Sequence, residues 1–309
     1  MGTKISMVSV SKLYSRFRPG NSISLSAGTV KECLCNSGIA PSDIGLLINT
    51  GIYRYRNTGE PSIAALIQNK AMPFSPGKAS KGKEAASVPN TFSFDLNNGG
   101  CGWLSGIEII DGFIQTGQIR HGIVVTADSE PFPGFSENYY FNTAAAAIIL
   151  SGTETTGGFS HFRTYSFPGF CEEFISSTRF GNLKGKWGER NILVIKKSET
   201  YVDNCIDCAV ISINRFLDET GFALKDIDLI IPSQCPKGFL TGIKDRLGIS
   251  CKLVEVRNNM NKELHTAGPA FALNNSWNDN RFKSAENILF LTVGSGIFVS
   301  IALFKNLSY

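Results

Sequence analysis

The sequence predicts a layered α/β protein that is built from two related halves. Apolar runs of strand length alternate with amphipathic helical patterns, which is typical of sheets that helices cover on both faces. The sequence also contains an internal repeat: residues 38–48 and 221–231 each begin with a glycine, continue with a short loop and an aspartate, and end in an apolar run. With 309 residues, of which 42% are hydrophobic, it can bury a large core.

Composition excludes several classes of protein. The 30 basic and 26 acidic residues leave a net charge of only +4, with no dense basic stripe, so nucleic-acid binding is not supported. We find no apolar run long enough for a membrane span, and residues 1–6 are typical of a first strand rather than a signal peptide. We therefore expect a cytoplasmic protein whose eight cysteines are reduced. Cys205 and Cys208 form a lone CxxC pair, so we expect no metal.

In the first half, the pattern predicts a helix over 26–37 that ends at Gly38 and a strand that follows Asp43. A second helix follows Cys101, because apolar residues recur there at three- and four-residue spacing until Gly117. Apolar strands then cover 123–127 and 144–150.

The second half repeats this order. A helix over about 202–219 ends at Gly221, a helix follows His265, and strands cover 288–293 and 297–304. His265 is thus the counterpart of Cys101, since each lies 27 residues before the corresponding strand-end residue, Thr292 or Asp128. We divide the chain into a first half (1–152), a connecting segment (153–190) whose aromatics are candidates for lining an acyl tunnel, and a second half (191–309).

Cys101 is the candidate nucleophile. It lies among glycines at the start of a helix, where the positive helix end stabilises a thiolate. The alternative is a small buried cysteine packed behind a turn. If the two equivalent helix starts converge, Cys101 and His265 supply a nucleophile and a proton acceptor, which is the minimum for thioester chemistry.

These residues resemble the thiolase superfamily, and most of all β-ketoacyl-acyl carrier protein synthase III. The resemblance rests on Asn97-Asn98-Gly99-Gly100-Cys101-Gly102, on Pro232-Ser233-Gln234-Cys235-Pro236 and on Gly294-Ser295-Gly296. It implies a five-layer αβαβα fold and a dimer, either a homodimer or a heterodimer with a related subunit. It also implies that Cys101 is acylated by a coenzyme A or acyl carrier protein thioester. The backbone N–H groups of Cys101 and Gly296 would form the oxyanion hole.

The chain departs from the family pattern at three places. Ser233 stands where synthase III has a histidine, and His265 stands where it has an asparagine. Part of the family's N-terminal region, which helps to hold coenzyme A, is lacking. Glu60 lies in a loop that in the family borders the acyl pocket, often that of the partner subunit, so it is a candidate base or else a solvated carboxylate paired with Arg54 or Arg56.

The leading functional hypothesis is a condensing enzyme of fatty-acid, polyketide or related metabolism. Cys101 would hold the acyl group, and His265, with Ser233 and Glu60, would assist a Claisen-type step that gives a β-keto product. No permanently bound cofactor is expected. Acyl transfer to an oxygen or nitrogen acceptor is one alternative, and a non-catalytic partner subunit of a ketosynthase heterodimer is another. Lys78, Lys81 and Lys83 could meet an acidic carrier protein, although a solvated loop is the simpler reading.

Overall fold

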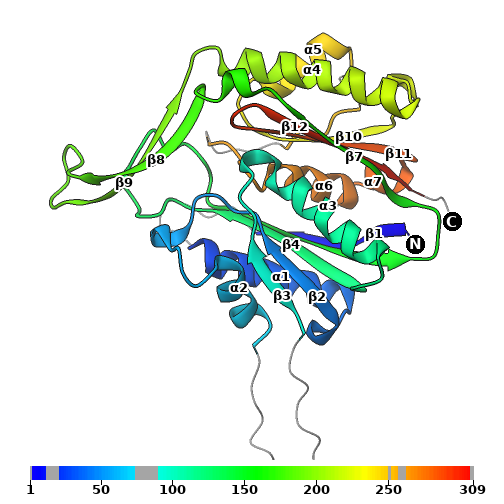
Figure 1. Cartoon of the computed structure of the whole chain (residues 1–309), viewed down its shortest axis with the longest axis horizontal. Coiled ribbons are helices and arrows are strands. Elements are labelled where there is room, and N and C mark those ends of the chain that lie inside the picture. Colours follow the sequence, from blue (N-terminus) through cyan, green and yellow to red (C-terminus); the bar gives the residue numbers. More distant parts are fainter. Residues whose placement is uncertain (1, 12–20, 74–89, 250–251, 257–261, 307–309) are drawn as a thin grey trace, which may run out of the picture.

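The computed structural model describes residues 2–11, 21–73, 90–249, 252–256 and 262–306. Two sheets lie one above the other, and helices fill the space between them and cover both outer faces (Figure 1). The expected five-layer αβαβα fold is therefore confirmed.

The first sheet has five strands. In spatial order they are β1 (Gly2–Val10), β6 (Ala144–Thr153), β4 (His121–Asp128), β2 (Ile44–Asn49) and β3 (Phe92–Asp95). β6 runs antiparallel to β1 and to β4, whereas β4, β2 and β3 are parallel. Their buried apolar residues are those of the expected strands.

The second sheet repeats this arrangement with four strands. In the corresponding order they are β7 (Gly158–Ser166), β12 (Phe298–Lys305), β11 (Asn287–Gly294) and β10 (Leu229–Pro232). β12 is antiparallel to both neighbours, and β11 is parallel to β10. The four strands match β1, β6, β4 and β2 in order and direction, so the internal duplication in the sequence is also present in the fold.

Helices form the other three layers. The outer face of the first sheet carries α1 (Ser22–Ser37) and α2 (Ile63–Ala71). The central layer holds α3 (Gly102–Gln115) and α6 (Gly268–Asn278), followed by α7 (Arg281–Ser284). The outer face of the second sheet carries α4 (Tyr201–Thr220) and α5 (Phe239–Leu247). Short 3-10 helices are η1 (Pro41–Asp43), η2 (Tyr55–Asn57), η3 (Gly99–Cys101), η4 (Pro168–Phe170) and η5 (Leu224–Asp226). The largest core cluster lies in the central layer. No helix among the described residues is long and apolar enough to cross a bilayer.

The two duplicated helices end as their sequences predict. Gly38 after α1 and Gly221 after α4 have φ of 69° and 74°, and each N–H donates to the carbonyl four residues earlier. This left-handed cap favours glycine. α1 begins earlier than the expected residue 26, because the Asn21 side chain accepts the N–H of Ser24 and caps the first turn.

The segment that we expected to connect the halves holds regular structure. β7 belongs to the second sheet, so the duplicated second half begins at Gly158 rather than at residue 191. After β7 the chain forms a projecting hairpin, β8 (Phe174–Gly181) and β9 (Arg190–Lys197), to which β5 (Ser136–Glu137) adds a third strand (Figure 1). β7 was missed because its exposed face is polar and its alternation is weak.

The halves touch directly where η3 meets the end of β11. A Cβ atom on Gly100 would lie 2.2 Å from the carbonyl oxygen of Val293, which no side chain could tolerate without movement of the backbone. Glycine at this position therefore allows the loop of one half to lie against the strand of the other.

Gly100→Ala should destabilise the protein by about 1–3 kcal/mol, the usual range for an overpacked site. Gly112→Ala is the matched control in α3, because no atom lies within 4 Å of its added Cβ. That change should be neutral or stabilise by about 0.5–1 kcal/mol. Urea unfolding of both variants measures the difference, and equal stabilities would contradict the described contact.

Candidate active site

Cys101 ends η3 directly before α3 and is fully buried. Its Sγ lies 3.3 Å from the carbonyl oxygen of Phe298 and 3.6 Å from that of Thr292. The thiol therefore donates to the backbone at the facing ends of β12 and β11. Gly294 lies beside this sulfur, because a Cβ atom built on Gly294 would be 3.3 Å from Sγ of Cys101.

Burial raises the pKa of the Cys101 thiol, and the hydrogen bonds around it offset this only in part. The position at a helix start had predicted a stabilised thiolate. That expectation is wrong for this structure, because complete removal from water disfavours the charged form more than the helix end favours it. The resting sulfur is a neutral thiol.

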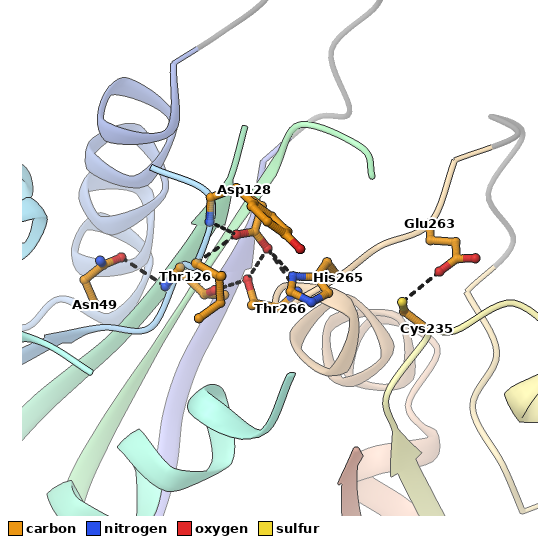
Figure 2. A network of polar contacts seen from close by, with 10 residues as sticks. Asn49, Thr126, Asp128, Cys235, Glu263, His265 and Thr266 are labelled. Carbon is orange, nitrogen blue, oxygen red and sulfur yellow. Dashed lines mark hydrogen bonds and ion pairs between the residues drawn. The ribbon is translucent and has the colours of Figure 1, made fainter. Parts of the chain in front are cut away.

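His265 lies in the loop before α6, at the position that corresponds to Cys101 in the other half. Its ring is mostly buried and packs against Phe141, with ring centroids 4.4 Å apart, and against Tyr53, at 5.3 Å. Its Nδ1 lies 2.9 Å from Oδ2 of Asp128, the last residue of β4 (Figure 2). The imidazole is thus held in one orientation by a residue of the first half.

Asp128 is the centre of a polar network that joins the halves (Figure 2). One carboxylate oxygen accepts the backbone N–H groups of Ile52 and Tyr53, each at 2.9 Å. The other faces His265 and accepts the hydroxyl of Thr266 at 2.6 Å and its N–H at 3.2 Å. A buried carboxylate is stable in this position only because several donors surround it.

These donors decide the charge of Asp128. Burial acts to raise its pKa, but the imidazole of His265, the Thr266 hydroxyl and the Tyr53 N–H favour the carboxylate and bring the pKa down to about 2. An ionised carboxylate can only accept, so Nδ1 of His265 carries the proton and donates it to Asp128. The Nε2 atom of a neutral His265 then has a free lone pair and can act as a base.

A small pocket of about 20 Å³, room for roughly one water molecule, lies beside this imidazole. The polar residues that line it are Ser233, Cys235, His265, Ser295 and Tyr140. The other lining residues are Phe141, Phe174, Tyr201, Gly100, Val293, Gly294 and Pro236. The structure therefore brings the loop of Cys101 and the ring of His265 to one pocket. The sulfur itself lies behind Gly100 and Gly294 and does not line it.

Ser233 lines the pocket at the end of β10. Its Oγ accepts the N–H of Val293 at 3.1 Å, which leaves the hydroxyl hydrogen free to donate. Cys235, two residues later, donates its thiol hydrogen to Glu263 at 2.7 Å (Figure 2). Burial and the negative charge of Glu263 raise the pKa of Cys235, so this second thiol is also protonated.

Two expected site residues lie away from this pocket. Glu60 is exposed, and Arg54, its expected partner, pairs instead with Asp95 at 3.4 Å. Gly296 does not line the pocket, whereas its neighbours Gly294 and Ser295 do. The N–H of Cys101, expected in the oxyanion hole, donates to the carbonyl oxygen of Asn98 at 3.0 Å.

Residues 78, 81 and 83, the candidate carrier-binding lysines, lie outside the described residues. Within the described part of the chain, no group of three or more histidine, cysteine or acidic side chains could hold a metal ion.

Known proteins resemble this chain in sequence and in fold. A family model described as "3-Oxoacyl-[acyl-carrier-protein (ACP)] synthase III C terminal" matches residues 217–306, the segment that contains Ser233 and His265. The β-ketoacyl-[acyl-carrier-protein] synthase III of Aquifex aeolicus is 20% identical over 86% of this chain and 78% of its own length. That of Sphingopyxis alaskensis is 21% identical, with coverage of 91% and 83%. In sequence, the chain is therefore similar to synthase III proteins, and we refer to it as synthase III-like.

Solved structures show that the fold extends over nearly the whole synthase III-like chain. The synthase III crystal structure from Aquifex aeolicus superposes with a TM-score of 0.76 at 17% identity and covers 98% of this chain and 100% of that one. A variant of OleA from Xanthomonas campestris, crystallised with bound lauric acid and lauroyl-CoA, superposes with a TM-score of 0.76 at 16% identity, covering 99% of each chain.

Sequence reasoning had missed three polar residues of this synthase III-like site. Asp128 carried a usable signal, since it is a carboxylate at the end of an apolar strand, 27 residues after Cys101. Tyr140 and Glu263 carried none, because only the paired backbones of residues 140–142 and 263 bring Tyr140 to the pocket and Glu263 to the thiol of Cys235.

Asp128→Asn keeps the side-chain shape and removes the charge. Because the folded-state pKa lies near 2, below the ordinary 3.8, the carboxylate contributes stability that is complete above about pH 4 and is lost as the pH falls towards 2. We expect the variant to be less stable than wild type by about 2 kcal/mol at pH 7, and the gap to close below pH 4.

Urea unfolding at pH 7, 4 and 3 measures this gap. Asp245→Asn, on the exposed side of α5, is the control and should leave stability unchanged at each pH. A gap for Asp128→Asn that is as wide at pH 3 as at pH 7 would show that charge is not its cause.

Proposed function

We propose that this synthase III-like protein is a condensing enzyme that carries its acyl group on Cys101. The observation that supports this most is the shared pocket, in which the loop of Cys101 meets an imidazole oriented by Asp128. The substrate would be an acyl thioester of coenzyme A or of an acyl carrier protein. The bound lauroyl-CoA of the OleA variant, a structure of the same fold, supports a thioester as the ligand class.

Acylation requires the Cys101 sulfur to leave the carbonyl oxygens of Phe298 and Thr292 and turn towards the pocket. Its proton would pass to Nε2 of His265, and the sulfur would then attack the thioester carbonyl. The carbon–sulfur bond of the substrate would break, and the departing coenzyme A or carrier thiolate would take the proton from His265, which returns to its neutral form. The pocket must also enlarge, because about 20 Å³ holds no acyl chain. The side chains of Phe174 and Tyr201, at the starts of β8 and α4, line it and are the groups that would have to move.

In the second step, His265 would remove a proton from the acceptor. With a carbon acceptor this gives a Claisen-type bond and a β-keto product, and Ser233 would donate a hydrogen bond to the acceptor's carbonyl oxygen. We assign the base in this step to His265, which lines the pocket of its own chain, and the role of Glu60 stays a prediction.

Acyl transfer to an oxygen or nitrogen acceptor is the second candidate function. One specific observation favours it: the site offers a single oriented base, the Asp128–His265 pair, and deprotonating a hydroxyl needs no more than that. The same acyl-Cys101 intermediate serves both functions, so only the acceptor distinguishes them. The expected dimer and cytoplasmic location stay predictions.

Intact-mass spectrometry after incubation with a panel of acyl thioesters tests the shared intermediate. Wild type and Cys35→Ala, which removes an exposed thiol of α1, should gain one acyl mass, whereas Cys101→Ala should gain none. Loading of Cys101→Ala, or no loading across the panel, would reject the acyl enzyme, and the second result would favour the non-catalytic partner subunit.

Product analysis then separates the two transfer reactions. Acyl-loaded protein is mixed with malonyl and acyl thioesters, and separately with alcohols and amines. A β-keto product supports condensation, and an ester or amide supports the second candidate. His265→Gln should slow either transfer by roughly 10²–10⁴-fold, the usual contribution of a general base.

A further inference from the structure

Tyr140, one of the residues that line the pocket of His265, carries an unused hydrogen-bond donor. Its hydroxyl oxygen is buried and has no hydrogen-bond partner among the described residues. Buried polar atoms without partners are rare in folded proteins, and each needs an explanation. A hydroxyl kept unpaired beside an oriented base is suited to bind a group that the substrate supplies.

The backbone fixes where this hydroxyl lies. The carbonyl of Tyr140 accepts the N–H of Glu263 at 3.1 Å, and the carbonyl of Glu263 accepts the N–H of Asn142 at 2.8 Å. The Tyr140 ring packs on Phe141 at 4.5 Å, and Phe141 packs on the His265 ring at 4.4 Å. On the outer side, the Lys197 ammonium lies 5.2 Å from the centre of the Tyr140 ring. The ring is thus held from both sides.

Tyr140 cannot serve as an acid or base at neutral pH. Burial first, and then the neighbouring Cys235 and Glu263, raise its pKa well above the ordinary value of 10. The phenol therefore keeps its proton and can only donate or accept a hydrogen bond.

Ser233 provides a second free hydroxyl hydrogen in the same pocket. Its Oγ accepts the Val293 N–H, and no described residue accepts its hydrogen. The pocket thus combines two O–H donors, from Tyr140 and Ser233, with one base, Nε2 of His265. An enolate forms when a base removes the α-proton of a carbonyl compound, and two hydrogen-bond donors to its oxygen stabilise the negative charge that develops there.

We propose that Tyr140 is a catalytic residue whose hydroxyl, together with that of Ser233, binds the carbonyl oxygen of an enolisable acyl thioester as the acceptor. This inference rests on the proposed function and selects carbon rather than oxygen or nitrogen as the attacking atom. It also assigns a role to a residue that the family resemblance does not mark.

The step balances as follows. Nε2 of His265 takes a proton from the α-carbon of the acceptor, and the C–H electron pair becomes the enolate double bond, with the charge on the oxygen held by Tyr140 and Ser233. The α-carbon attacks the carbonyl of acyl-Cys101. The carbon–sulfur bond breaks, and the Cys101 sulfur leaves as a thiolate that recovers the proton from His265.

The experiment compares Tyr140→Phe with Tyr139→Phe. The control removes the neighbouring hydroxyl, which is also buried without a partner but does not line the pocket. Each variant loses one oxygen atom from a similar environment. Urea unfolding should show both to be as stable as wild type or more stable, because an unpaired buried hydroxyl destabilises the folded state.

The first readout is deuterium exchange at the α-carbon of propionyl-N-acetylcysteamine thioester in D₂O, which NMR monitors. All proteins in this comparison carry Cys101→Ala, so no acyl enzyme can form. Exchange requires His265 and the two donors but no acyl enzyme, so it is independent of the loading test. Tyr140→Phe should slow exchange by roughly 10²-fold, the effect of losing one such donor, and Tyr139→Phe should leave it unchanged. No exchange in the parent, or equal rates in all three proteins, would overturn the proposal.

The second readout separates loading from transfer in proteins that retain Cys101. Tyr140→Phe should acylate Cys101 at the wild-type rate and then form β-keto product roughly 10²-fold more slowly. Transfer to an alcohol, which has no carbonyl oxygen, should not change. A variant slowed equally in loading, condensation and alcohol transfer would show a structural role for Tyr140 and contradict the assignment.

Discussion

The carboxylate of Asp128 is the interaction on which the candidate active site depends. It accepts hydrogen bonds from backbone groups of the first half at Ile52 and Tyr53, and from Thr266 and His265 of the second half. The negative charge is acceptable in a buried position because donors surround it, and in turn it sets which nitrogen of His265 holds a proton. Without it, the imidazole would lose its orientation and at least four donors would lose their acceptor.

Duplication explains why the loop of Cys101 and His265 reach the same pocket. α3 and α6 are equivalent helices of the central layer, and the residues that precede them come together because the halves face each other across that layer (Figure 1). One helix start carries a thiol and the other an imidazole. The Gly100–Val293 contact sets how closely the loop before α3 approaches the end of β11 in the other half.

Local signals in the sequence were sufficient for much of this fold. Gly38 and Gly221 marked helix ends because few other residues adopt their left-handed conformation, and the apolar runs marked strands that are buried on both faces. β7 has one polar face, so its membership of the second sheet depends on pairing with β12, which no local pattern shows.

The site was less predictable for a related reason. His265 and Ser233 line one pocket together with Gly100 of the Cys101 loop, whereas the catalytic roles of these residues stay predictions. The direction of the Cys101 thiol, the pairing of Asp128 with His265 and the unpaired hydroxyl of Tyr140 all depend on contacts between residues more than a hundred positions apart or on paired backbones. Burial reversed the expected ionisation of Cys101, since helix position is visible in a sequence and desolvation is not.

The closed position of Cys101 also bears on how this protein would meet oxidants. Peroxides attack cysteine as the exposed thiolate, and the product is a sulfenic acid that can proceed to irreversible acids. Here the sulfur is neutral, away from water and bonded to strand carbonyls, while Cys35 and Cys171 are exposed at the surface. Oxidative damage would therefore fall first on these surface cysteines, and Cys101 would become vulnerable only if its surroundings opened to water.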